Sequence, residues 1–251
     1  MNSNNPFFKN KTFTNADSEV VHEATVIGVN ETMTVSGTIN KSFLMLILLI
    51  ASASVTWIMT FNGQNPMVMT IGGALVGFIL VLIATFRPQN SGFLAPGYAI
   101  FEGLFIGGIS AIFEVMYPGM VIQAVSCTFV TFMVCFGLYK YEIVKVNDKF
   151  RSVVIAATLA IGTYYLISWL LSMFTSFQPV HYGNSMISIG ISAIVIVVAA
   201  LNLFLDFDQI EKGVQQKMPK YMEWYSAMGL MITLVWLYIE FLRLLSKLQK
   251  K

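Results

Sequence analysis

Seven stretches of about twenty mostly apolar residues run through this chain and constrain its fold more than any other feature. They cover 42–61, 67–86, 93–113, 119–139, 153–174, 186–206 and 226–246. A helix needs about 20 apolar residues to cross the hydrocarbon core of a bilayer, whereas the strands of a membrane barrel need only about 9–11. The sequence therefore predicts an all-α polytopic membrane protein, with a polar tail (1–41) and one seven-helix transmembrane domain (42–251).

The composition excludes the main soluble classes. Only 11% of the residues are charged and 56% are hydrophobic, whereas a soluble domain carries about 25% charged residues. A chain of this size cannot bury so much apolar surface in one soluble core. A net charge of +2 is also too small for a nucleic-acid-binding domain, which needs clustered basic charge. The expected partner of most of the surface is therefore the lipid bilayer.

The basic residues predict the orientation. Eleven of them fall in the tail and in the second, fourth and sixth connections, namely Lys9, Lys11, Lys41, Arg87, Lys140, Lys145, Lys149, Arg151, Lys212, Lys217 and Lys220. Since basic residues concentrate on the cytoplasmic side, we expect a cytoplasmic N-terminus. The seventh run is ambiguous because it contains Glu240 and Arg243 and is followed by lysines. It either crosses the membrane fully or is re-entrant.

Three acids fall within the apolar runs: Glu102, Asp206 and Glu240. A charge at the bilayer centre costs about 2.5–3.5 kcal/mol on insertion scales, so such acids face the bundle interior, form pairs or mark an ion path. Each also has a structural explanation. Glu102 can be a hydrogen-bonded buried carboxyl, Asp206 can lie with Asp208 in the headgroup zone, and Glu240 can pair with Arg243 three residues on.

Catalytic signatures are missing from the sequence. It contains no His-Glu-x-x-His pair, no G-x-S-x-G elbow, and neither a Walker A nor a Rossmann glycine pattern. We therefore expect that the protein is not an enzyme and has no cofactor. The sequence allows no firm assignment of a metal site.

Six segments together resemble one known family. They are MTVSGTINK (33–41), YAIFEGLFIG (98–107), YPG (117–119), ALNLFLDFDQIE (200–211), PKYMEWY (219–225) and WLYIEFLRLL (236–245). On these segments the chain resembles the transmembrane Bax inhibitor motif family, in its bacterial YccA-like branch, over about 33–248. The resemblance implies a bundle with the last helix near its centre, in the cytoplasmic membrane of a bacterium.

The resemblance also implies a function and its residues. Family members are pH-sensitive calcium leaks that use one carboxylate at the end of helix 6 and one in helix 7, which match Asp206 and Glu240. Two close carboxylates cannot both ionise cheaply, and oxygen ligands suit calcium as the transported ion. The resemblance therefore implies a pH gate made of Asp206 and Glu240.

The chain departs from the family pattern near this pair. The helix-7 acid is Glu rather than Asp, and Arg243 lies one turn away, where it can neutralise Glu240. Arg87 is the candidate for the family's basic residue on helix 2, and Glu102 and Asp208 are further accessory candidates. The two gate acids meet only if the last helix starts near 230 or is re-entrant. The alternative function is a non-transporting regulator that binds another membrane protein.

Overall fold

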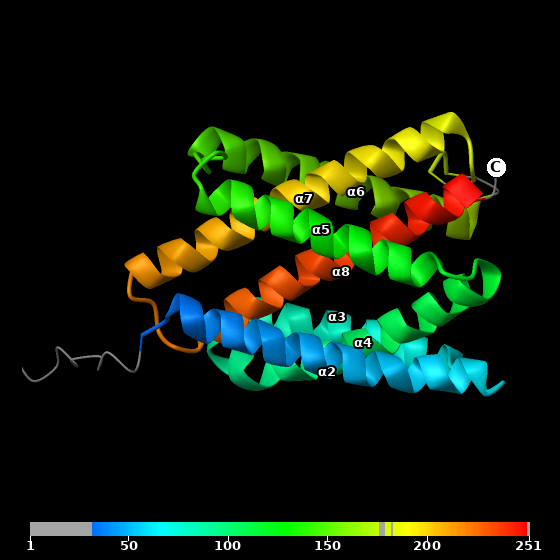
Figure 1. Cartoon of the computed structure of the whole chain (residues 1–251), viewed down its shortest axis with the longest axis horizontal. Helices are drawn as coiled ribbons and strands as arrows, with labels where there is room; N and C mark the ends of the chain where they lie inside the picture. Colours follow the sequence, from blue (N-terminus) through cyan, green and yellow to red (C-terminus); the bar gives the residue numbers. More distant parts are fainter. Residues whose placement is uncertain (1–31, 176–178, 182, 250–251) are drawn as a thin grey trace, which may run out of the picture. The chain divides into compact units, whose positions relative to one another are not determined.

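Seven α-helices follow one another through the described part of the chain, residues 32–175, 179–181 and 183–249 of a computed structural model (Figure 1). They are α2 (Val35–Phe61), α3 (Met67–Phe86), α4 (Ser91–Met116), α5 (Met120–Lys140), α6 (Asp148–Phe174), α7 (Met186–Gln215) and α8 (Met222–Gln249), with a short 3-10 turn η3 (Pro88–Asn90) before α4. All seven are long and apolar enough to cross a membrane. The predicted all-α fold with seven membrane-spanning helices is confirmed.

Most helices extend beyond the apolar runs that predicted them. α2 begins at Val35, before the expected tail boundary at 41, and residues 1–31 of the predicted tail lie outside the described residues. α7 continues to Gln215 and α8 starts at Met222, so most of the predicted polar loop 207–225 is helical. The apolar runs mark only the part of each helix that is suited to the hydrocarbon core. Polar residues continue the same helix into the headgroup region, where hydropathy gives no signal.

Local sequence explains where several helices start. The side chains of Thr34, Asn147 and Ser185 cap α2, α6 and α7, and each accepts a hydrogen bond from a backbone N–H of the first turn. Such caps satisfy donors that the helix itself leaves unpaired. The turn before α5 passes through Gly119 with φ 82°, a left-handed conformation that favours glycine.

Glycines bring α2, α3 and α4 into close contact. A Cβ at Gly103 would overlap Ser52 and the Leu49 carbonyl of α2, and a Cβ at Gly108 would overlap Thr70 of α3. Small residues let helix backbones approach closely in a membrane, where no hydrophobic force acts between helices. Glycines of α4 therefore let both α2 and α3 pack tightly against it.

The last helix lies at the centre of the bundle. α8 contacts α2, α4, α5 and α7, and Figure 1 shows it passing between α2 and α4 on one side and α5 and α7 on the other. It is the most buried of the seven helices. Since α8 is one uninterrupted helix from Met222 to Gln249, it neither breaks near 230 nor forms a re-entrant segment.

The two ends of the bundle carry different polar groups. At one end, here named the Lys41 end, α2, α4, α6 and α8 begin. At this end Glu223 pairs with Lys41, and Asp208 pairs with Arg151 and Lys212. The opposite end holds the described residues of the α6–α7 connection and is named the His181 end.

Candidate functional site

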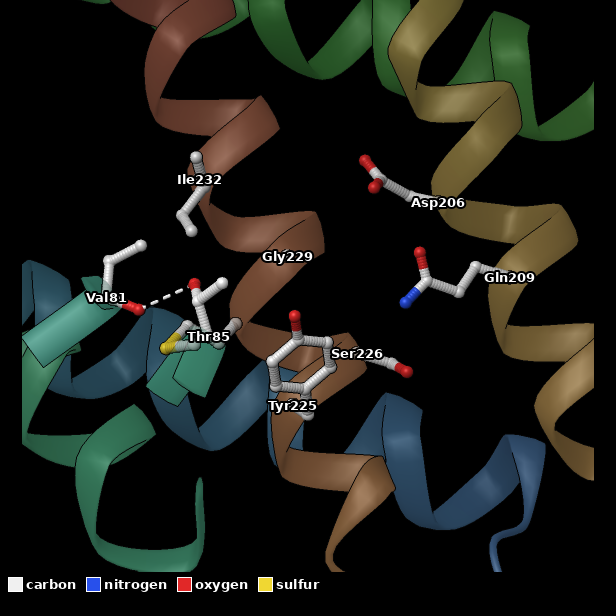
Figure 2. Close-up of a pocket in the computed structure, with 9 residues that line it drawn as sticks. Val81, Thr85, Asp206, Gln209, Tyr225, Ser226, Gly229 and Ile232 are labelled. Atoms are coloured by element: carbon white, nitrogen blue, oxygen red, sulfur yellow. Dashed lines mark hydrogen bonds between the residues drawn. The ribbon is translucent and has the colours of Figure 1, made fainter. Parts of the chain in front are cut away.

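A small pocket lies between α3, α7 and α8, with the carboxylate of Asp206 on its wall (Figure 2). Its volume is about 140 Å³, and it is lined by Val81, Thr85, Asp206, Gln209, Tyr225, Ser226, Met228, Gly229 and Ile232. Figure 2 shows Asp206 and Gln209 reaching from α7 toward α8, and the Tyr225 hydroxyl pointing into the same space. Thr85 and Gln209 are exposed, so the pocket opens on the side of the bundle between α3 and α7. We name it the Asp206 pocket.

The Asp206 carboxylate is incompletely satisfied. The Thr233 hydroxyl lies near it but donates to the Gly229 carbonyl at 3.3 Å. The Oδ2 atom of Asp206 is buried and has no hydrogen-bond partner among the described residues. The hydroxyl of Ser226, on the same pocket, is also buried without a partner. An unpaired buried carboxylate oxygen is unfavourable. The pocket therefore presents a carboxyl group and several neutral oxygens to whatever enters it.

Glycine at position 229 keeps the pocket open. A Cβ built on Gly229 would lie 3.9 Å from Oδ1 of Asp206, which is ordinary van der Waals contact. A larger side chain at this position would therefore occupy the space in front of the carboxylate.

Glu240 has a different environment, further along α8. Its side chain is 1% exposed, and Oε1 accepts hydrogen bonds from Arg243 at 3.0 Å and from the hydroxyl of Tyr165 on α6 at 3.3 Å. The guanidinium of Arg243 also lies 5.4 Å from the centre of the Tyr165 ring. Arg243 therefore neutralises Glu240 within the same helix. This ion pair is the structural explanation that the sequence offered for an acid inside the last apolar run.

The structure does not bring Asp206 and Glu240 together as the resemblance implied. Asp206 lies beside Gly229 and Thr233 of α8. Glu240 is eleven residues beyond Gly229 and seven beyond Thr233, which is about 16 and 10 Å along the helix axis. The reason is the unbroken course of α8 from Met222. Leu237, which is fully buried, occupies the turn between Thr233 and Glu240.

The accessory residues also lie apart from the Asp206 pocket. The carboxylate of Glu102 packs on Gly77 of α3, where Oε2 would be 3.1 Å from a Cβ. Arg87 is exposed at the end of α3 and does not line the pocket. Asp208 faces away from the pocket and binds Arg151 and Lys212, the latter at 2.9 Å. The three predicted membrane acids therefore do not share one cavity.

The sequence interpretation missed a polar stripe on α8. Ser226, Gly229, Thr233 and Glu240 are spaced by three, four and seven residues, which places them on one face of the helix. Ser226, Gly229 and Thr233 lie at the Asp206 pocket or its carboxylate. This spacing was visible in the sequence, but small polar residues in an apolar helix also serve ordinary packing.

A second cluster of polar groups surrounds the end of α8. The ring of His181 packs against Tyr164 and Tyr165, and its Nδ1 lies 3.1 Å from the Tyr164 hydroxyl. The ammonium of Lys247 donates hydrogen bonds to the Ser188 carbonyl and to the Ser192 hydroxyl. Burial lowers the pKa of His181, and the positive charges of Arg243 and Lys247 lower it further. His181 is therefore held in its neutral form.

The donor set limits what the Asp206 pocket can bind. Within the residues that the structure describes, no three His, Cys, Asp or Glu side chains gather into a metal site. One carboxylate with hydroxyl and amide oxygens suits a hard cation such as calcium, but tight calcium sites use more carboxylates. The pocket therefore fits transient contact with a cation better than permanent binding.

Comparison with known proteins identifies one family. A family model described as Bax inhibitor 1 like matches residues 5–250, nearly the whole chain. Among curated proteins, none matches the chain.

Proposed function

The chain belongs to the Bax inhibitor 1-like family, and from this membership we propose that it forms a pH-sensitive leak for calcium across a membrane. The resemblance of its helix 6 and helix 7 motifs to calcium-leak members supports this function. We assign it no catalytic role. We propose the cytoplasmic membrane of a bacterium as its location, with the Lys41 end facing the cytoplasm.

The observation that carries the proposal is the unpaired oxygen of Asp206. Its Oδ2 is buried and has no partner in the described part of the chain, and the same pocket offers oxygens of Ser226, Thr85, Gln209 and Tyr225. Conduction requires sites that bind an ion well enough to admit it and weakly enough to release it. A single carboxylate with neutral oxygens meets both conditions. Protonation of Asp206 would remove its negative charge and would lower the flux.

We propose that Asp206 and Glu240 act in series along α8. A cation that leaves the Asp206 pocket toward Glu240 must pass the turn held by Leu237, which is fully buried. Glu240 is already paired with Arg243, which supports a closed state for the conformation described here. Opening would require a displacement of Leu237 and an exchange of the partners of Glu240.

Calcium flux into liposomes tests this proposal. The purified protein is reconstituted with a calcium-sensitive dye inside the vesicles, and flux is measured at several pH values between about 6 and 8. We expect flux that falls at low pH in the natural protein and is strongly reduced at every pH in Asp206→Asn. Asp148→Asn is the matched control, since Asp148 is exposed at the start of α6.

Two outcomes would contradict the proposal at different levels. Absence of calcium flux at every pH would exclude the leak itself. Equal flux in the natural protein, Asp206→Asn and Glu240→Gln would exclude the two acids as its residues.

A truncation of Leu237 tests the position of the barrier. Leu237→Ala opens space between Thr233 and Glu240, so it should raise the flux. Leu242→Ala is the control, because Leu242 is also fully buried on α8, two residues beyond Glu240. Both variants should lose about 2–5 kcal/mol of stability, but only Leu237→Ala should leak faster. Equal flux in the two variants would argue against a barrier at Leu237.

One observation favours the alternative function, a regulator that binds another membrane protein. Glu102, Asp206 and Glu240 have separate surroundings, and Glu240 has its own cation. Acids that lie in separate surroundings do not form one shared ion path. Crosslinking in native membranes followed by mass spectrometry tests this function. A reproducible membrane-protein partner together with absent calcium flux would favour it, and failure to recover any such partner would count against it.

A further inference from the structure

A long groove lies along the side of the bundle between α2 and α5, with α4, α7 and α8 at its base. Its volume is about 1260 Å³, and on α2 it runs from Val35 to Trp57. This length corresponds to about 33 Å at helical rise, close to the roughly 30 Å thickness of the hydrocarbon core. The groove is separate from the Asp206 pocket, since the two have no lining residue in common.

The hydroxyl groups that line the groove already have hydrogen-bond partners within the protein. The hydroxyls of Ser110 and Tyr238 lie 2.7 Å apart, and Ser110 also donates to the Ile106 carbonyl. Thr38 and Thr128 each donate to a carbonyl one turn earlier in their own helices. Because these groups need no water, the interior of the groove fits an apolar occupant.

The walls of the groove carry large side chains. Phe43 and Ile50 on α2 are 62% and 56% exposed, and Phe129 on α5 is 62% exposed. Transmembrane helices that dock closely use small residues, which let the backbones approach each other. Bulky, irregular walls leave space that flexible acyl chains can fill and a helix backbone cannot. The side-chain sizes therefore favour lipid over a partner helix.

The Lys41 end of the groove has an excess of positive charge. Lys140, at the end of α5, lines the groove, is exposed and has no ion-pair partner within the described ranges. Lys145 is 3.6 Å from Glu142, and Asp208 is shared by Lys212 and Arg151. Glu211 accepts a hydrogen bond from Tyr139. The groove lining itself holds three cations and three acids, and Arg151, which binds Asp208 but does not line the groove, adds a fourth cation. Among the lining cations, Lys140 is the one without an ion-pair partner in the described ranges.

We propose that this groove is a binding site for an anionic phospholipid. The acyl chains lie between α2 and α5 against α8, and the phosphate of the headgroup contacts Lys140 at the Lys41 end. Basic pockets between transmembrane helices bind anionic headgroups in this manner, and each basic residue contributes severalfold in affinity. This lipid site does not depend on the proposed calcium leak.

Native mass spectrometry of the full-length protein tests the headgroup contact. The protein is released from vesicles that contain equal parts of phosphatidylglycerol and phosphatidylcholine, and the lipids that remain bound are counted. We expect preferential retention of phosphatidylglycerol, with a preference about fivefold weaker in Lys140→Gln. Lys149→Gln should behave like the natural protein, because Lys149 is exposed at the same end but does not line the groove. An equal loss in both variants, or no loss in Lys140→Gln, would overturn the proposal.

A second pair of variants tests the position of the acyl chains. Val125→Trp places a large ring inside the groove, whereas Val197→Trp places it on a part of α7 that does not line the groove. The two valines are 46% and 57% exposed, so both variants should fold, which thermal unfolding in detergent checks. We expect Val125→Trp alone to reduce the bound phosphatidylglycerol severalfold. Equal retention in both variants, or a co-purified membrane protein in place of the lipid, would overturn the groove as a lipid site.

Discussion

Glu223, in the first turn of α8, accepts hydrogen bonds from both the backbone N–H and the hydroxyl of Thr34, each at 2.9 Å. Thr34 is also the residue that caps α2, through the N–H of Gly37. The second oxygen of Glu223 pairs with Lys41 on the next turns of α2. One nearly inaccessible carboxylate therefore fixes the start of the first described helix to the start of the central helix.

Removing this carboxylate charge should destabilise the protein. Glu223 is 1% exposed, and loss of one member of a buried ion pair costs about 3–5 kcal/mol because the other charge is left uncompensated. We expect Glu223→Gln to lose about 3 kcal/mol in thermal or denaturant unfolding in detergent. The control is Glu142→Gln, whose pair with Lys145 is exposed on both sides and should contribute under about 1 kcal/mol. Similar losses in the two variants would contradict the assigned role of Glu223.

Gly37 should be required for the same contact. A Cβ at Gly37 would overlap the carboxylate of Glu223, and this carboxylate cannot move without losing its bonds to Thr34 and Lys41. Gly37→Ala should therefore lower the unfolding midpoint although alanine is the better helix former. Gly72→Ala is the matched control, because no atom lies within 4 Å of a Cβ built there. That variant should be neutral or slightly stabilising, and a stable Gly37→Ala protein would refute the overlap.

The pairing of Glu240 with Arg243 can be measured by a double-mutant cycle. Arg243→Gln leaves the buried Glu240 carboxylate without its cation, so it should destabilise the protein by about 3 kcal/mol. Glu240→Gln in the same chain should restore much of this loss, because no uncompensated charge then remains. Unfolding of the two single variants and the double variant gives the coupling energy. A coupling energy near zero would mean that Arg243 does not neutralise Glu240.

The stability of the protein should depend on pH through His181. Burial and the charges of Arg243 and Lys247 lower the pKa of His181 in the folded state, whereas an unfolded chain has a histidine pKa of about 6.5. As the pH falls below about 6.5, the unfolded chain takes up more protons and gains free energy relative to the folded state. The contribution of neutral His181 is therefore complete above that pH and is lost progressively below it.

His181→Gln measures this contribution, because glutamine keeps a polar side chain that does not titrate. The unfolding midpoint of the natural protein should fall more steeply between about pH 7.5 and 5.5 than that of the variant. Identical slopes would show that His181 does not carry the pH dependence.

Much of the fold followed from the sequence because hydrophobicity acts locally along the chain. Each apolar run must form its own backbone hydrogen bonds in lipid, so it must be a helix. Two helix ends differ from the limits of their apolar runs. The sixth run ends at 206 and the seventh starts at 226, whereas α7 continues to Gln215 and α8 starts at Met222, because polar residues continue both helices beyond the hydrocarbon core.

The surroundings of the charged groups depend on tertiary contacts. The sequence by itself determined the seven membrane helices and the three acids inside them. It also indicated that Glu240 can pair with Arg243, since these two residues lie one turn apart on one helix. Only the tertiary structure decided that Asp206 lines a pocket with Ser226, that Asp208 turns away to Arg151, and that Glu223 ties α8 to Thr34. These outcomes depend on how α8 is placed relative to α2 and α7, and residues far apart in the chain set that placement through packing.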